Sequence, residues 1–117
     1  MDLLKLFDQS SEVEDFKAGS VIFAAGDAAA KMYVILEGEV EIRSRDKLLE
    51  QMRPGSAFGE MALIGNHVRS ATAVAATNCR LAPITERRFL FMVQQTPFFA
   101  LHIMRVLAER ILRKESV

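Results

Sequence analysis

The chain has 117 residues, carries 15 Lys and Arg against 15 Asp and Glu, and is 50% apolar. The length suits one domain, and the apolar fraction excludes a disordered chain. The balanced charge argues against a nucleic-acid wrapper and a polybasic membrane anchor, because both need an excess of one sign. We therefore expect a single domain over residues 1–117.

Cysteine content and hydropathy exclude several further classes of protein. The one cysteine, Cys79, excludes an intrachain disulfide, structural zinc and cysteine-ligated iron–sulfur clusters, since each needs several ligands. No apolar run is long enough to span a bilayer, and the first residues lack the basic and apolar regions of a secretory signal. The sequence predicts a protein of the reducing cytoplasm, without membrane insertion.

The first half of the chain has the texture of a β protein. A short helix is predicted over Leu3–Phe7, directly after Asp2. From Phe16 onward, short apolar runs alternate with turn signals, which are Gly19, Gly26-Asp27, Gly38, Arg45-Asp46 and Pro54-Gly55. This spacing is typical of an all-β barrel or sandwich.

Three early runs are predicted as strands. Val21–Phe23 is a compact group of β-formers, and Met32–Leu36 is apolar on both strand faces, which indicates a central strand. Glu39–Arg43 alternates strictly, with Val40 and Ile42 inward. The Glu37-Gly38 pair between the last two runs predicts a tight hairpin.

The last third of the chain changes from strands to helices. After two further β-like stretches, Val68–Ala76 and Arg80–Ile84, Thr85 can cap a helix that runs through Gln95. Thr96-Pro97 then predicts the start of a longer helix over Phe98–Lys114. Its apolar residues include a near-heptad seam of Ala100, Met104, Leu107 and Ile111. A helix with more than one apolar face must contact both its own barrel and a second surface.

This order of elements sets the fold class. Strands come first, over about residues 16–84, and helices come last, over about residues 85–115. The sequence therefore predicts a mainly β (α+β) domain with most of its mass in a barrel.

Residues 58–72 carry the chemistry of the chain. Gly59 lets the backbone approach a ligand closely, and a short helix that starts there would offer free N–H groups to an anion. Arg69 shares a strand face with Ala71, Ala73 and Ala75, whose small side chains leave space. An arginine facing such a space needs a buried anion, and a phosphate meets that need.

Glu60 needs a different partner from Arg69. A phosphate repels a carboxylate, so the natural partner of Glu60 is a donor such as a sugar hydroxyl. An arginine for phosphate, a carboxylate for a hydroxyl and an apolar wall for a base together indicate a nucleotide with one compact phosphate.

The segment Phe58-Gly59-Glu60-Met61-Ala62-Leu63 with Arg69-Ser70-Ala71-Thr72 resembles the phosphate-binding cassette of cyclic nucleotide-binding domains. These domains occur in catabolite-activator regulators, protein-kinase regulatory subunits and cyclic nucleotide-gated channels. The resemblance spans Phe7 to Arg113 and includes the upstream segments Lys17-Ala18-Gly19, Ala25-Gly26-Asp27, Tyr33 to Val40 and Arg53-Pro54-Gly55.

This resemblance implies an eight-stranded antiparallel β-roll (jelly-roll barrel) with a short N-terminal helix and two C-terminal helices. It implies that Glu60 binds the ribose 2′-hydroxyl, that Arg69 binds the cyclic phosphate, and that Ser70 adds a hydroxyl to the phosphate or the base edge. Backbone N–H groups of Gly59, Met61, Ala62 and Ala71 would assist. The expected ligand-binding set is Phe58, Gly59, Glu60, Met61, Ala62, Arg69, Ser70 and Ala71.

The resemblance also bears on the choice of nucleotide. In the family, a Thr after the arginine resembles a guanine-favouring feature and an Ala an adenine-favouring one. Ser70 is intermediate and is similar to bacterial cAMP binders, so cAMP is favoured over cGMP. Val68 departs from the family pattern, which usually has Pro there, and we expect a small effect on loop stiffness.

Two other functions stay open. The fold can serve as an interaction or dimerisation module, with another anionic ligand or an empty pocket. A metal-dependent barrel enzyme is less favoured, because His67 and His102 have no adjacent Cys or carboxylate pattern. Without a nucleophile–base pair, we expect a sensor that is not an enzyme and needs no cofactor.

The expected partners follow from the same features. They are a cyclic mononucleotide and a second copy or another protein on the helix Phe98–Lys114. The family's regulators carry a DNA-binding helix-turn-helix after the last helix, whereas only six residues follow Ile111 in this chain. We expect no direct DNA binding by this chain and a downstream effector elsewhere, both for a complete short protein that signals through a partner and for a fragment of a regulator, channel or kinase.

Overall fold

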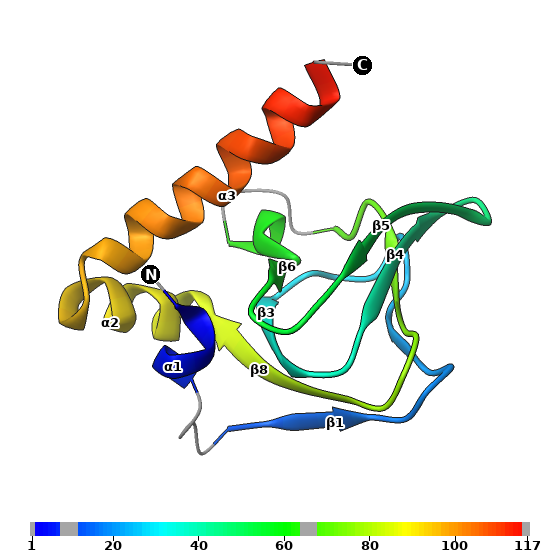
Figure 1. Cartoon of the computed structure of the whole chain (residues 1–117), viewed down its shortest axis with the longest axis horizontal. Helices are drawn as coiled ribbons and strands as arrows, with labels where there is room; N and C mark the ends of the chain where they lie inside the picture. The colour runs from blue at the N-terminus through cyan, green and yellow to red at the C-terminus, as the bar shows by residue number, and fades with distance from the viewer. Residues whose placement is uncertain (1, 8–11, 64–67, 116–117) are drawn as a thin grey trace. The chain divides into compact units, whose positions relative to one another are not determined.

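The computed structural model describes residues 2–7, 12–63 and 68–115 (Figure 1). It divides into two compact units, Asp2–Glu86 and a helical unit that starts at Arg87. The border lies close to the predicted change from strands to helices near residue 85.

The first unit consists of two four-stranded antiparallel sheets and a short helix, α1 (Leu3–Phe7). One sheet has the order β1-β8-β3-β6, and the other has the order β2-β7-β4-β5. The strands are β1 (Glu14–Phe16), β2 (Val21–Phe23), β3 (Lys31–Glu37), β4 (Val40–Ser44), β5 (Lys47–Met52), β6 (Ala57–Phe58), β7 (Thr72–Ala75) and β8 (Cys79–Thr85). The predicted fold class is confirmed: the structure is mainly β, and two further helices follow the strands.

The core lies between the two sheets. Both contribute buried side chains to one cluster, in which Tyr33, Ile35, Phe58 and Leu81 of the first sheet meet Val40, Met52, Ala73 and Ala75 of the second. Strands place alternate residues on opposite faces, so each sheet turns one apolar face to the other. The arrangement explains why the strand runs alternate in polarity.

Strand β3 is central, as its sequence predicts. It lies between β8 and β6, and its residues Met32 to Ile35 are all buried. Its neighbour β8 runs through Pro83, which pairs with Tyr33. Strand β1 pairs only with Cys79–Leu81 of β8. Pro83 lies outside this paired stretch, so β1 does not need a hydrogen bond from the N–H group that proline lacks.

The predicted hairpin at Glu37-Gly38 is wrong. Strand β3 belongs to one sheet and β4 to the other, so the chain changes sheets at Gly38. Gly38 has a φ of 91°, and a Cβ there would collide with the carbonyl oxygen of Asn78. A short connection fits a corner as well as a hairpin, and long-range pairing decides between them.

The true hairpin of this region joins β4 and β5 (Figure 1). Its turn residues, Arg45 and Asp46, have φ values of 50° and 65°. Positive φ at both central residues is the geometry that fits the twist of two antiparallel strands.

The predicted strand Val68–Ala76 is shorter in the structure. Val68 makes an isolated bridge with Ala28, and β7 begins only at Thr72. Arg69 is instead held by its backbone, whose N–H donates to Asp27 O at 2.8 Å and whose carbonyl accepts from Gly26 N at 2.8 Å. The loop between β2 and β3, and not a continuous strand, therefore positions Arg69.

The second unit contains α2 (Glu86–Gln95) and α3 (Phe98–Glu115). Helix α2 begins directly after Thr85, as predicted, and the Phe89 and Phe99 rings of the two helices lie 5.2 Å apart between centroids. Two members of the apolar seam of α3, Met104 and Ile111, are 58% and 57% exposed. In the described part of the chain, no helix is long and apolar enough to cross a membrane.

Candidate functional site

The site begins where β6 ends. Ala57 and Phe58 are buried and pair with Val34 and Tyr33 of the central strand, which fixes the start of the segment. Gly59 follows with a φ of 76°, in the left-handed region that suits glycine. A single 3-10 turn, η1 (Glu60–Ala62), comes next. Glycine is therefore the residue that lets the chain leave β6 and turn at once.

Arg69 is the centre of the site. Its side chain is buried, and it donates from Nη1 to Gly59 O at 3.1 Å and from Nη2 to Lys31 O at 2.6 Å. Three segments that are far apart in the sequence thus meet at one guanidinium. Both of these acceptors are neutral backbone carbonyls, so they orient the positive charge without cancelling it.

One nitrogen of Arg69 has no partner. Within the described part of the chain, Nε is buried and has no hydrogen-bond acceptor. A buried donor without an acceptor is costly, and the cost rises when the group is charged. Burial lowers the pKa of Arg69, while Tyr33, Asp27 and Glu60 act to raise it. This geometry suits an anion beside Nε.

Gly59 is needed for space as well as for conformation. A Cβ at Gly59 would lie 2.8 Å from Arg69 Nη1 and 3.5 Å from the Phe23 ring. Any larger residue would therefore displace the guanidinium. The turn and the arginine form one unit, although ten positions separate them.

The other predicted site residues divide into two groups. Glu60 and Ala62 are buried in η1, whereas Met61 and Ser70 are exposed and Ala71 is half-buried. The N–H of Ala62 donates to Gly59 O at 3.2 Å, so this predicted helper group is used inside the turn. The segment brings Glu60 close enough to act electrostatically on Arg69. His67 lies outside the described residues.

Sequence reasoning missed two contributors to the site. Lys31 offers its backbone carbonyl, which every residue type has, so no pattern could have identified it. Phe23 lies with its ring centroid 3.9 Å from Arg69 Cζ, which is a cation–π contact. Its presence in a short β run was visible, but its position against the arginine was not.

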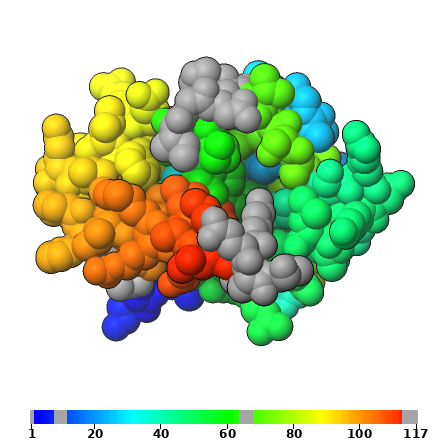
Figure 2. Space-filling view, turned by 90° about the horizontal axis from the view of Figure 1, so that it is seen from above, coloured from blue at the N-terminus to red at the C-terminus, as the bar shows by residue number. Residues whose placement is uncertain are grey.

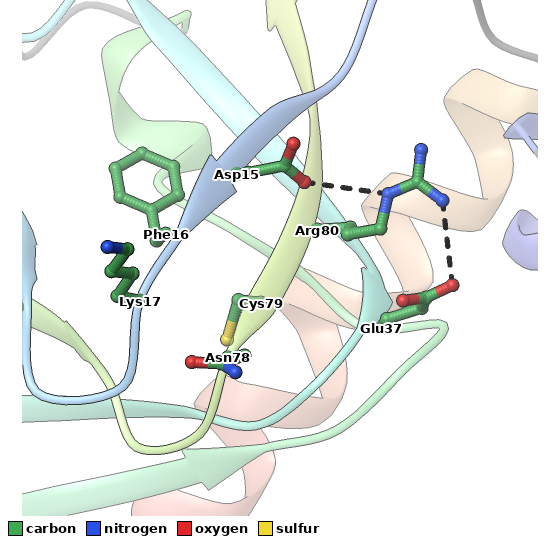
Figure 3. A pocket seen from close by; sticks show the side chains of 7 residues that line it. All are labelled: Asp15, Phe16, Lys17, Glu37, Asn78, Cys79 and Arg80. Atoms are coloured by element: carbon green, nitrogen blue, oxygen red, sulfur yellow. Dashed lines mark ion pairs between the residues drawn. The ribbon is translucent and has the colours of Figure 1, made fainter.

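A hollow lies near Glu37, at the end of β3 away from Lys31. It has a volume of about 330 Å³ and is lined by Asp15, Phe16, Lys17, Glu37, Asn78, Cys79 and Arg80 (Figure 3). Figure 3 shows Arg80 between two carboxylates, with Nε 3.5 Å from Asp15 Oδ1 and Nη1 3.6 Å from Glu37 Oε1. These are long, exposed ion pairs of small energetic value.

Metal ligation and cysteine chemistry were two further possibilities for the described residues. Among them, no group of three or more His, Cys, Asp and Glu side chains could hold a metal ion. Cys79 is buried, and burial raises the pKa of its thiol, which donates to Glu39 O at 3.2 Å. A protonated, enclosed thiol is a poor nucleophile.

Comparisons with known proteins identify the family of the chain. The family profile described as the cyclic nucleotide-binding domain matches residues 13–96. The cyclic AMP receptor protein of Thermus thermophilus is 29% identical over 101 residues, which cover 82% of this chain and 47% of that protein. The chain thus spans about half the length of this relative.

Solved structures give the same result. The crystal structure of the Thermus thermophilus catabolite activator protein matches with a TM-score of 0.81 and 28% identity, over 89% of this chain and 51% of that one. A structure described as belonging to a cyclic-GMP-dependent signalling pathway of bacterial phytopathogenesis matches with a TM-score of 0.80 and 28% identity, over 94% of this chain and 91% of that one.

Proposed function

The chain belongs to the cyclic nucleotide-binding domain family, and we propose that it binds a cyclic mononucleotide, cAMP in preference to cGMP, as a non-catalytic sensor in the cytoplasm. The observation that carries the proposal is the buried guanidinium of Arg69, which two backbone carbonyls orient and whose Nε has no acceptor among the described residues. A cyclic phosphate supplies that acceptor and the compensating charge.

The proposal gives each residue of the segment a role. Arg69 binds the cyclic phosphate and Glu60 the ribose 2′-hydroxyl. Gly59, Met61 and Ala71 offer backbone N–H groups, and so does Ala62 if its turn opens. Phe58 fixes the start of the segment, and the exposed Ser70 is available to the phosphate or the base edge. The exposed Val68 makes its bridge through the backbone, which suits our expectation that its departure from the family's proline matters little.

Calorimetric titration tests the proposal. We expect saturable binding of cAMP, weaker binding of cGMP, and little binding of 5′-AMP, whose phosphate is not cyclised. At a ligand concentration of about 100 times the dissociation constant, the ligand should stabilise the fold by roughly 2.7 kcal/mol. Absence of both heat and melting-temperature shift with either cyclic nucleotide would contradict the proposal.

A matched pair of variants locates the site. We expect Arg69→Ala to weaken cAMP binding at least about a hundredfold, because it removes the charged partner of the phosphate. Arg80→Ala removes the same type of side chain from β8, beside the other end of β3, and should leave cAMP affinity unchanged. Equal affinity of the two variants would show that the phosphate does not bind at Arg69.

We further propose that the ligand signal passes through the C-terminal helices. The turn η1 is a single short turn that follows a glycine in the left-handed region, so a ligand that binds there can change how the turn packs. Hydrogen exchange of the backbone amides of Glu86–Gln95 and Phe98–Glu115, with and without cAMP, tests this step. Identical exchange in both states would contradict it.

Helix α3 supports a second candidate function, dimerisation. Met104, Ile111 and Leu112 are 58%, 57% and 63% exposed, and Figure 2 shows α3 side chains, in orange and red, at the surface. Exposed apolar residues along one helix fit a second copy of the chain. Sedimentation of Ile111→Glu should show a monomer, and Leu48→Glu, at an exposed leucine of β5, should match the wild type. A monomeric wild type would exclude this function.

A further inference from the structure

We propose that Phe23 is a positioning residue for Arg69, whose ring sets the plane of the guanidinium and thereby aims its Nε–H at the bound anion. This inference rests on the proposed function, since it concerns the same site. It adds to that site a residue that neither the cassette nor its spacing contains.

The contact itself is close. Arg69 Cζ lies over the Phe23 ring, 3.9 Å from the ring centroid. A guanidinium over an aromatic face gains both electrostatic and stacking energy, more so when water is excluded. Arg69 is buried, so the contact is of the stronger kind.

Two other aromatic rings contact Phe23. Phe23 stacks on Tyr33 with centroids 6.5 Å apart and packs against Phe58 at 6.0 Å. Tyr33 and Phe58 are both buried and belong to paired strands, β3 and β6. The aromatic trio Phe23, Tyr33 and Phe58 therefore forms a fixed support for the guanidinium.

The ring supplies a restraint that the hydrogen bonds lack. Arg69 is tied through Nη1 to Gly59 O and through Nη2 to Lys31 O. Two acceptors define a line, about which a planar group can still tilt. A flat surface against the face of the guanidinium removes that tilt and fixes the direction of the Nε–H bond. A donor that is already oriented loses less freedom when the ligand binds.

The contrasting interpretation is that Phe23 only fills the core. The chain offers a matched control in Phe16, which is also half-buried, also lies on a three-residue strand, and contacts Tyr33 edge-on at 6.4 Å. Both rings pack against the same apolar cluster, but Phe23 also packs against Phe58 and contacts the guanidinium of Arg69. A purely structural role predicts the same behaviour for both phenylalanines.

The experiment compares cAMP affinities of the full chain. Phe23→Leu keeps an apolar side chain without an aromatic face and should weaken binding about tenfold, whereas Phe16→Leu should change it less than about twofold. Phe23→Tyr keeps the face and should restore wild-type affinity. In an Arg69→Lys background, Phe23→Leu should have little further effect, because an ammonium group has no plane to set.

The outcomes separate this inference from the proposed function. A wild type that binds neither cAMP nor cGMP overturns both. A wild type that binds, together with equal affinities for Phe23→Leu and Phe16→Leu, overturns only the role of Phe23. An undiminished effect of Phe23→Leu in the Arg69→Lys background does the same.

A measurement without ligand covers the case in which Phe23→Leu fails to fold. In the wild-type protein, the ring should shift the NMR resonance of the Arg69 Nε–H upfield, and Phe23→Tyr should keep that shift. A wild-type resonance at the position of an unstacked arginine would overturn the inference.

Discussion

Two arginines lie beside opposite ends of strand β3, and they differ in their exposure and in the groups that surround the guanidinium. Beside Lys31, Arg69 is 8% exposed, bonded to neutral carbonyls and left with an unpartnered Nε within the described chain. Beside Glu37, the Arg80 side chain is 50% exposed and lies near two carboxylates.

The difference teaches how a protein of zero net charge makes an anion site. An exposed arginine among carboxylates is already compensated by them and by water, so a passing anion gains little there. A buried arginine that is oriented by neutral carbonyls keeps an uncompensated charge, so an anion that binds it gains more. Burial and the type of acceptor, more than the count of charges, therefore separate the candidate site from the hollow of Figure 3.

The largest expected effect concerns the glycine at the Arg80 end. Gly38→Ala should lower the free energy of unfolding by about 3 kcal/mol, from a left-handed backbone and overpacking against the Asn78 carbonyl. Gly19→Ala is the control, since Gly19 has a φ of 87° and open space around its Cβ position. Urea unfolding measures both. Equal losses would show that the close approach at Gly38 is unimportant.

The second prediction sharpens the contrast between the arginines. Arg69→Lys should weaken cAMP binding by about 2 kcal/mol, because an ammonium cannot bond both carbonyls and the phosphate in one plane. Arg80→Lys keeps the same charge and should change affinity by less than a few tenths of a kcal/mol. Titration calorimetry at one ionic strength compares them. A similar loss of affinity in the two variants would contradict the proposed difference between Arg69 and Arg80.

The third prediction tests the unit formed by the turn and the arginine. Gly59→Ala should weaken cAMP binding by about 1–2 kcal/mol, because the added Cβ meets Nη1 at 2.8 Å, in addition to the strain of a positive φ. Gly19→Ala has the same kind of strain, with a φ of 87° and nothing near its Cβ. It should lower stability similarly but leave affinity nearly intact. Unfolding and titration of both variants separate strain from displacement.

The last prediction concerns stability in alkali and has no effect at neutral pH. It involves two titrating groups, one near each end of β3. Burial raises the pKa of the Cys79 thiol and of the Tyr33 hydroxyl above their ordinary values of 9.0 and 10.0. The folded state thus retains these protons to a higher pH than the unfolded state does. The resulting stabilisation is complete below the ordinary pKa and is lost as pH rises through the folded one.

Unfolding at a series of pH values measures this loss. We expect a constant free energy of unfolding near neutral pH, a first decrease above about pH 9.0 and a second above about 10.0. Cys79→Ala should remove the first decrease and Tyr33→Phe the second. A free energy that rises above pH 9.0 would have the wrong sign.

Sequence patterns anticipated much of the fold because they are local. The alternation in Val40 and Ile42, the four buried residues of β3 and the start of α3 after Pro97 all depend on neighbours a few positions away. The Glu37-Gly38 connection was misassigned because alternation gives the inward face of a strand, but not the strand with which it pairs.

The sequence by itself determined the order of strands and helices and the segment that contains Gly59, Glu60 and Arg69, since residue types and spacing carry that information. Only the tertiary structure decided what surrounds Arg69. The Lys31 carbonyl has no side-chain signature, and the Phe23 ring reaches the guanidinium across 46 positions of chain, the difference between residues 23 and 69. Such contacts arise from sheet pairing, which a local pattern does not encode.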